Sequence, residues 1–331
     1  MSIRLVAGAA FALLLGAVPA AQAQTPLASG STTLKLDSAV ARTLSANGVR
    51  VRPIAPARGG VSFPITGGRL DGASGTIEHA GGLRFSAGGR SLSARSLKIK
   101  LGRSSTLSAR VGKARVTLLR VDTRRAKIAR AGLDTKISGV RVALTATGAR
   151  ALNATFHTHL FRAGLELGSV SVRATPATVA LKSGTTSVTL DAGAGAALQS
   201  LGIAAAPIGS DALAFPITGG RVNATSFAGS IEHSGGIALS RGDTRVELTD
   251  FTIGIDATPD LTATVGGARV PILSVDLAAL KADVKGRRIT LDGAALKLTA
   301  AAAGALNQAF ATTAFTEGLL LGTATVKATA K

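Results

Sequence analysis

Histidine is the residue type in this chain best suited to chemistry, and two histidines occur in matching settings. His79 follows Glu78 and His233 follows Glu232, each ahead of a pair of glycines. An imidazole that is oriented by a carboxylate can hold a metal or transfer a proton. Adjacent side chains on a strand point to opposite faces, so the two members of each couple should not touch. The pattern therefore favours a structural role, such as a hydrogen bond that closes the following Gly-Gly turn.

A second histidine motif is the i, i+2 pair His157 and His159, a spacing that could chelate a metal from one face of a strand. Ala311 and Thr313 stand at the matching positions later in the chain, so the pair is not a repeated feature. No Gly-x-Ser-x-Gly elbow follows a strand, and no cysteine, phosphate loop, zinc pattern or calcium loop occurs. We therefore expect no resident metal and no enzymatic activity.

The segments that must position these histidines are duplicated. The block Phe63–Arg69 recurs letter for letter as Phe215–Arg221. The block Ile77–Gly82, which contains the first Glu-His couple, recurs as Ile231–Gly236 with one substitution. The offset between the copies is 154 residues at both ends and 152 at the first block. Such a repeat predicts two copies of one supersecondary design.

The repeat sets the expected domain organisation. We expect a first domain at residues 30–174, a linker at 175–184 and a second domain at 185–329. Each domain is long enough to bury a core of its own.

The N-terminal residues 1–23 have the pattern of a secretory signal peptide. A charged start that includes Arg4 precedes an apolar run at 5–18 and the small-residue site Ala21-Gln22-Ala23. No other segment is long and apolar enough to span a bilayer. The expected location is therefore secreted, either extracellular or associated with the cell wall.

Most of each copy alternates with period two and is rich in Val, Ile, Leu and Thr, which predicts strands. The clearest expected strands are 49–54, 83–86, 97–101, 114–121 and 136–144. One helix should begin at the N-cap Asp37 and stop at Gly48, and another should cover 145–156. We therefore expect an all-β chain with minor helices, folded as two tandem antiparallel β-sandwich (Ig-like) domains with about two short helices each.

The two copies differ in charge. Residues 30–175 contain 25 Lys and Arg against 6 Asp and Glu, a net charge of +19, whereas residues 176–331 contain 12 of each. Self-repulsion makes such a concentration costly, so it favours an anionic partner over a merely solvated surface. The candidate ligands are an anionic cell-wall polymer, a lipid headgroup or a small acidic molecule. The residues expected to bind it are Arg110, Lys113, Arg115, Arg120, Arg124, Arg125, Lys127 and Arg130.

Specific nucleic-acid binding is not expected. The chain contains no Trp and no Tyr, so the aromatic platforms on which bases stack are reduced to Phe and His.

Several short, Gly-rich blocks in both copies resemble one known family. They are Phe63–Gly68, Gly75–Ile77, Gly81–Phe85 and Leu97–Leu101 in the first copy, and Phe215–Arg221, Gly229–Leu239 and Phe251–Ile255 in the second. These blocks look like the HtaA domain, a β-sandwich module of secreted and cell-wall proteins of actinobacteria. The resemblance implies haem uptake or another binding role at the envelope.

The family's haem ligands do not all have counterparts here. Members hold haem on an axial tyrosine that is supported by a histidine in a Gly-His-Gly-Gly turn. This chain has no tyrosine, and the matching turns read Ala87-Gly88-Gly89 and Arg241-Gly242-Asp243. Histidine can also ligate haem, so His79 and His233 are the candidates for a rearranged haem site. Haem is therefore a possible cofactor.

Three hypotheses remain open from the sequence. The first is an HtaA-like binding protein whose basic first domain meets an anionic ligand or surface. The second is haem or iron capture at His79 and His233. The third is a structural or self-associating repeat protein of the envelope.

Overall fold

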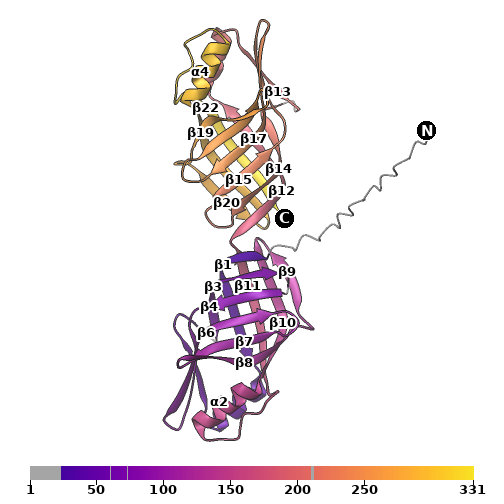
Figure 1. Ribbon diagram of the computed structural model, residues 1–331, viewed down its shortest axis with the longest axis vertical. Helices are drawn as coiled ribbons and strands as arrows, with labels where there is room; N and C mark the ends of the chain where they lie inside the picture. The colour runs from indigo at the N-terminus through magenta and orange to yellow at the C-terminus, as the bar shows by residue number, and fades with distance from the viewer. Residues whose placement is uncertain (1–23, 60, 73, 210–211) are drawn as a thin grey trace, which may run out of the picture.

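The computed structural model describes residues 24–331 except 60, 73 and 210–211, so the expected signal peptide at 1–23 lies outside the described residues. The described chain forms two similar units placed end to end, each with eleven strands and two helices (Figure 1). Within the described ranges, no helix combines the length and the apolar character that a membrane crossing requires.

The elements of the first unit are β1 (Thr25–Leu36), α1 (Ser38–Ala46), β2 (Arg50–Ile54), β3 (Ser62–Asp71), β4 (Ser74–His79), β5 (Gly82–Ala87), β6 (Arg90–Leu101), β7 (Thr106–Val111), β8 (Ala114–Asp122), β9 (Lys127–Ala131), β10 (Asp134–Leu144), α2 (Ala146–Phe156) and β11 (Glu166–Pro176). The second unit repeats this order with β12 (Thr178–Leu190), α3 (Ala192–Ser200), β13 (Ala204–Ile208), β14 (Ala214–Asn223), β15 (Gly229–His233), β16 (Gly236–Arg241), β17 (Thr244–Ile255), β18 (Asp260–Val265), β19 (Ala268–Asp276), β20 (Lys281–Lys285), β21 (Arg288–Leu298), α4 (Ala300–Ala309) and β22 (Leu320–Ala330).

Eight antiparallel strands of the first unit close into a ring in the order β6-β4-β3-β1-β11-β10-β8-β7, because β7 pairs back onto β6. Strands β5 and β2 extend the sheet from β6, and β9 pairs with β10. The second unit has the same ring, in the order β17-β15-β14-β12-β22-β21-β19-β18. The interior of each ring is lined by apolar side chains that form one core cluster per unit.

The all-β class with minor helices is confirmed, but the Ig-like sandwich is wrong, since each unit is a closed, barrel-like sheet. The closing pairings are β6–β7 and β17–β18. Strand β6 is long enough to pair with β5 through its first half and with β4 through its second half. Period-two alternation is the same in a sandwich and in a closed sheet, so the sequence pattern does not separate them.

The segment expected as a linker, residues 175–184, belongs instead to β11 and β12. Only Ala177 separates these two strands. Its N–H donates to the carbonyl of Pro26, and its own carbonyl accepts from the N–H of Ala224. The Gly and Ser residues that suggested a loop are therefore part of a paired strand, with a register shift near Ser183.

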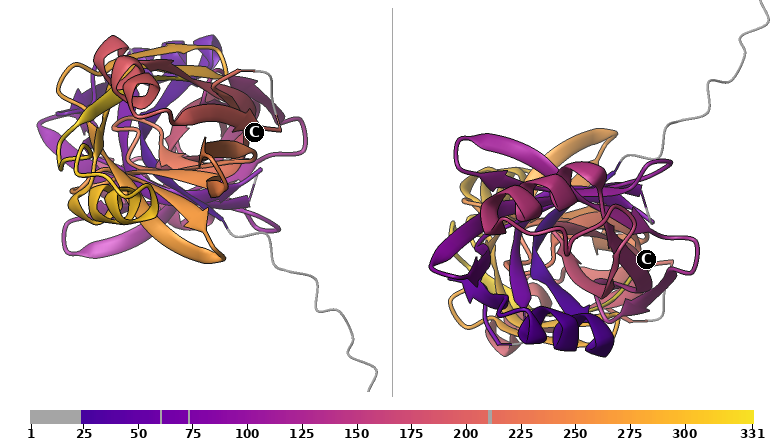
Figure 2. Two further views of the ribbon diagram at one scale, coloured as in Figure 1. Left: turned by 90° about the horizontal axis from the view of Figure 1, so that it is seen from above. Right: turned by 90° about the horizontal axis from the view of Figure 1, so that it is seen from below.

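The helices lie at the far ends of the units, away from the junction between them (Figures 1 and 2). Helix α1 begins where the side chain of Asp37 accepts a hydrogen bond from the N–H of Ala39 at 2.9 Å. Helix α2 begins at Thr145, whose hydroxyl accepts from the N–H of Gly148 and donates to the carbonyl of Thr117 on β8. The cap residue thus both starts the helix and fixes it to the closed sheet.

Candidate functional site

A buried histidine–threonine pair lies in the wall of each closed sheet. His79, on β4, places Nε2 2.7 Å from Oγ1 of Thr32 and Nδ1 3.2 Å from the carbonyl oxygen of Leu97. All four side chains of the two pairs are buried, with exposed fractions of 2 to 5 %. The pair in the second unit is His233 with Thr186, at 2.6 Å, and the carbonyl is that of Phe251.

The protonation state of these rings follows from their surroundings. Burial lowers the pKa of His79 from its ordinary value of 6.5 to about 4, and burial also lowers the pKa of His233. A carbonyl oxygen can only accept a hydrogen bond, so Nδ1 of each neutral ring must be the donor to it. Nε2 therefore accepts from the threonine hydroxyl, and both nitrogens of each ring are engaged within the wall.

This geometry supports a structural role for the two histidines. A haem iron bound at His79 would have to displace Thr32 from the Nε2 lone pair, deep in an apolar wall. Glu78 points to the other face of the strand and forms an ion pair with Lys98 at 2.8 Å. The carboxylate and the imidazole of the couple are thus separated by the strand, as the alternation predicts.

The other histidine motifs stand at the surface. His157 is the C-cap of α2 with φ of 53°, and both it and His159 are exposed. No cluster of three or more metal-ligating side chains is present among the described residues. The turn matched to the family's histidine is the two-residue tip Gly88-Gly89 between β5 and β6, where φ is +54° and +76°.

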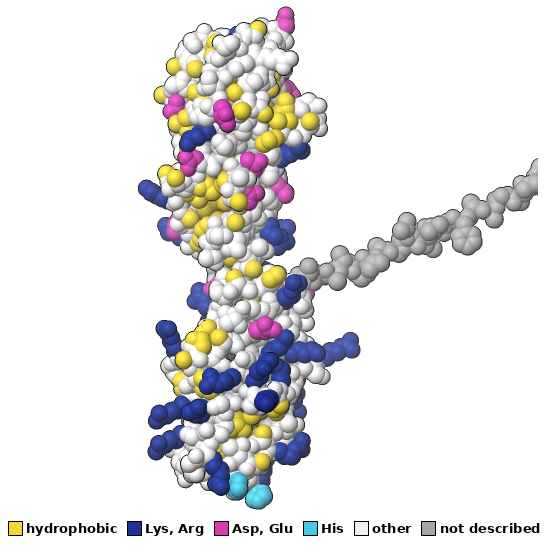
Figure 3. All heavy atoms as spheres, turned by 60° about the vertical axis from the view of Figure 1, so that its left-hand side comes forward, with side chains coloured by type: hydrophobic (Ala, Val, Ile, Leu, Met, Phe, Trp, Pro, Cys, Tyr) yellow, Lys and Arg dark blue, Asp and Glu magenta, His cyan; other side chains and the backbone are white. Residues whose placement is uncertain are grey.

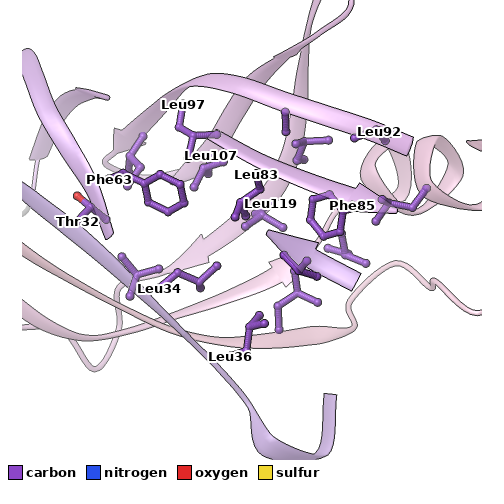
Figure 4. A pocket seen from close by; sticks show the side chains of 18 of the residues that line it. Thr32, Leu34, Leu36, Phe63, Leu83, Phe85, Leu92, Leu97, Leu107 and Leu119 are labelled. Atoms are coloured by element: carbon purple, nitrogen blue, oxygen red, sulfur yellow. The ribbon is translucent and has the colours of Figure 1, made fainter. Parts of the chain in front are cut away.

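The interiors of the two units differ in size. The first unit has an apolar cavity of about 60 Å³, into which Leu34, Phe63 and Leu107 point (Figure 4). The second unit has a cavity of about 620 Å³ at the equivalent place. The described residues around it are apolar apart from Thr186 and His233, which bond to each other.

The walls of the larger cavity offer water few partners. The polar atoms among its described lining residues are those of Thr186 and His233, which bond to each other. Ordered water in such a site needs two to four polar partners. The volume therefore suits an apolar filling.

Side-chain size accounts for part of the difference. Among the positions that line both cavities, five are smaller in the second unit: Val188 for Leu34, Ala205 for Val51, Leu239 for Phe85, Val246 for Leu92 and Ala324 for Val170. Two of these shared positions are larger there: Leu248 for Ala94 and Phe251 for Leu97. Substitution alone therefore does not explain the whole difference.

The closeness of a helix to the sheet is a second cause of the difference in cavity size. Gly148 of α2 lies so close to β8 that a Cβ atom there would stand 2.4 Å from the carbonyl oxygen of Leu118. The second unit has Ala302 at this position, so α4 cannot approach β19 as closely as α2 approaches β8. Consistent with this, Leu44 and Leu152 are buried, while their counterparts Leu198 and Leu306 are only half-buried.

The basic side chains of the first unit cover several of its sides. Figure 3 shows Lys and Arg along both edges and the front of this unit, and a mixture of both signs on the other. All eight basic residues predicted to bind an anion are exposed, but the structure splits them into groups. Arg110, Lys113, Arg115 and Arg120 lie on or between β7 and β8, whereas Arg124, Arg125, Lys127 and Arg130 lie on β9 and the loop before it. Arg124 is bound to Asp122, and this hydrogen-bonded pair lowers the pKa of the carboxyl.

One continuous group of arginines crosses the paired strands β2, β5, β6, β7 and β8. Arg95 stands directly opposite Arg110, and Arg110 directly opposite Arg115. Arg52 stands opposite Arg84 on β5. Arg84 lies two residues from the β5 residue that pairs with Arg95, so Arg84 and Arg95 lie on the same face of the sheet. We call these five exposed side chains the arginine band. None of them has an ion-pair partner in the part of the chain that the structure describes.

The second unit lacks this band. Ala206, Ala238, Thr249 and Thr264 occupy the first four positions, in the same pairings. The fifth position keeps an arginine, Arg269, whose guanidinium donates to the carbonyl of Asp250 and to Thr262. Arg115 makes the matching bonds to Ser96 and Ser108. The fifth arginine thus belongs to the scaffold, and the other four are specific to the first unit.

Sequence reasoning missed Arg52, Arg84 and Arg95, and it missed the cavity. A position-by-position comparison of the two copies would have marked the three arginines, because each is replaced by Ala or Thr. The cavity has no such signal, since its lining is apolar in both copies.

Comparisons with known proteins give a limited result. No family model matches this chain, and no curated protein does. Solved structures that are similar to it include two of one protein. The C-terminal domain of HtaA from Corynebacterium glutamicum is 19% identical with a TM-score of 0.36, over 46% of this chain and 99% of that domain. A domain-swapped dimer of a variant of that domain is 22% identical with a TM-score of 0.30, over 43% and 94%.

Proposed function

We propose that this chain is an exported, non-enzymatic binding protein whose first unit engages an anionic polymer or surface through the arginine band. The observation that supports this is the direct opposition of Arg95, Arg110 and Arg115 on three neighbouring strands. Paired side chains on adjacent antiparallel strands have Cβ atoms about 4.5–5.5 Å apart. Arginines that leave the sheet at that spacing form a ladder, and their guanidinium groups can meet successive phosphates or carboxylates.

The arrangement is costly in the absence of an anion. Like charges directly opposite each other destabilise a sheet, by roughly 0.2–1 kcal/mol per pair. The second unit folds the same strands with Thr249 and Thr264 in place of Arg95 and Arg110, so the scaffold does not require the charges. A bound anion would neutralise these arginines and remove the repulsion between them, which gives the arginine band a role in binding.

The test compares two variants of the full chain with equal loss of charge. The band variant combines Arg52→Ala, Arg84→Ala, Arg95→Thr and Arg110→Thr, which installs the residues of the second unit. The control combines Arg124→Gln, Arg125→Gln, Lys127→Gln and Arg130→Gln, which lie outside the band. The probes are linear polyphosphate and, separately, vesicles that contain phosphatidylglycerol.

We expect the unmodified protein to bind polyphosphate with an affinity that falls steeply with salt. The band variant should lose at least tenfold in affinity, and the control should lose much less. Equal losses in both variants would show that only the total charge matters and would overturn the proposal. Binding to vesicles but not to polyphosphate would identify a lipid surface as the partner.

A further inference from the structure

The cavity of the second unit opens to solvent. Three lining alanines, Ala301, Ala305 and Ala309, follow one face of α4 at a spacing of four residues, and all three are exposed. Two further lining residues reach the surface, since Ala205 of β13 is exposed and Leu190 at the end of β12 is 40% exposed. We take the three exposed alanines of α4 as the wall of the entrance.

We propose that this cavity binds the aliphatic chain of a single-chain fatty acid, with the polar head left at the entrance. Its volume of about 620 Å³ lies within the range of about 300–1,000 Å³ that is typical of small-molecule sites. The lining is mostly Leu, Val, Ile and Ala, and none of its described residues is charged. An alkyl chain matches these walls, while a charged group would remain unpaired inside them.

The chemistry of the lining favours an alkyl chain over a planar, iron-bearing ligand. The single imidazole, His233, has Nδ1 bonded to the carbonyl of Phe251 and Nε2 bonded to Thr186. The site thus offers no free ligand for iron.

The first unit is the internal control, because the same scaffold is filled there. Phe85 and Val51 stand where the second unit has Leu239 and Ala205, and the cavity is about a tenth as large. A variant that combines Val188→Leu, Ala205→Val and Leu239→Phe transfers the first unit's side chains to the second. It should narrow the cavity with side chains already compatible with this fold.

The experiment uses the delipidated full chain and a dansyl-labelled undecanoic acid as the probe. The chain has no Trp and no Tyr, so probe fluorescence is free of interference from those residues. We expect one probe to bind per chain and palmitic acid to displace it. Hexadecanol, which is uncharged, should displace it as well. The triple variant should weaken binding at least tenfold while its far-UV circular dichroism stays unchanged.

Two controls distinguish binding in the cavity from adsorption of the anionic probe to the basic first unit. Binding should persist at high salt, and it should persist in a variant with Lys127→Gln and Arg130→Gln. Loss of binding in either control would overturn the proposal. If the triple variant does not fold, Ala305→Leu replaces it, since this substitution narrows the entrance from an exposed helix position where Leu is well tolerated.

The remaining outcomes are also decisive. Unchanged binding in the folded triple variant, or in Ala305→Leu, would overturn the cavity as the site. Displacement of the probe by haemin but not by palmitic acid would overturn the aliphatic ligand. Displacement by dipalmitoyl phosphatidylglycerol but not by palmitic acid would identify a two-chain lipid and overturn the single-chain assignment.

Discussion

The hydroxyl of Thr186 donates to Nε2 of His233 at 2.6 Å, and Thr32 and His79 form the same bond in the first unit. Thr186 and His233 are the polar members of the described residues that line the cavity of the second unit, and the others are apolar. Thr186→Val should leave an unsatisfied nitrogen in the wall and lower the free energy of unfolding by about 1–3 kcal/mol. Urea denaturation followed by circular dichroism measures this. Thr189→Val, an exposed site on the same strand, is the matched control and should change stability little. Equal effects at both positions would contradict a role for the bond.

The stability of the first unit should depend on pH through His79. The folded pKa is lowered to about 4 from 6.5, so the unfolded chain takes up the proton first as pH falls. Stability is therefore complete above pH 6.5, declines between pH 6.5 and 4, and is reduced by about 3 kcal/mol below that window.

The contribution of His79 can be isolated with His79→Gln, which removes the titrating group. Carboxylates such as Glu78, whose pKa is lowered chiefly by its hydrogen bond to Lys98, also cost stability on acidification, and they remain in the variant. The difference between the two pH profiles should therefore lie between pH 6.5 and 4. Parallel profiles over that window would contradict the assignment.

The arginine band should be a source of instability that salt removes. Arg95→Thr with Arg110→Thr should raise the urea midpoint at low salt, because each relieved pair contributes roughly 0.2–1 kcal/mol. The gain should shrink at high salt, where exposed charges are screened. The reciprocal change, Thr249→Arg with Thr264→Arg, should lower the midpoint by a similar amount. A loss of stability in the first variant would show that these arginines support the fold.

Replacement of glycine by alanine should have opposite effects on stability at Gly148 and at Gly304. Gly148→Ala should destabilise the first unit by about 1–3 kcal/mol, because its Cβ would meet the carbonyl oxygen of Leu118 and push α2 off β8. Gly304→Ala meets no atom within 4 Å and should stabilise α4 by about 0.5–1 kcal/mol. Thermal unfolding of the two variants measures both. Stabilisation by both alanines would show that α2 does not sit closely on β8.

The parts of the fold that depend on local pattern could be predicted from the sequence. Alternation located strands such as β8 and β10, and the cap residue Asp37 located the start of α1. Closure of the sheet could not be predicted, because it depends on one long-range pairing, that of β6 with β7. The strands within residues 175–184 could not be predicted, because Gly and Ser also occur at irregular positions within paired strands.

The arginine band depends on the register of paired strands, and the cavity depends on side-chain volume. Arg95 and Arg110 are fifteen residues apart in the chain, and only the strand pairing places them opposite each other. The cavity arises from exchanges among apolar residues, such as Leu239 for Phe85, and from the substitution of Ala302 for Gly148. None of these exchanges changes the hydrophobic pattern, so a reading of that pattern gives both units the same interior.

The one-residue connection at Ala177 affects how the chain withstands proteolysis. Proteases cut stretches that can be drawn out of the fold, and exposed loop tips are their preferred sites. Between these two units the N–H and the carbonyl of Ala177 are both bonded, and strands flank it on either side. A protein built this way offers a protease no free loop at the junction, so its two units should stay joined for as long as both sheets remain folded.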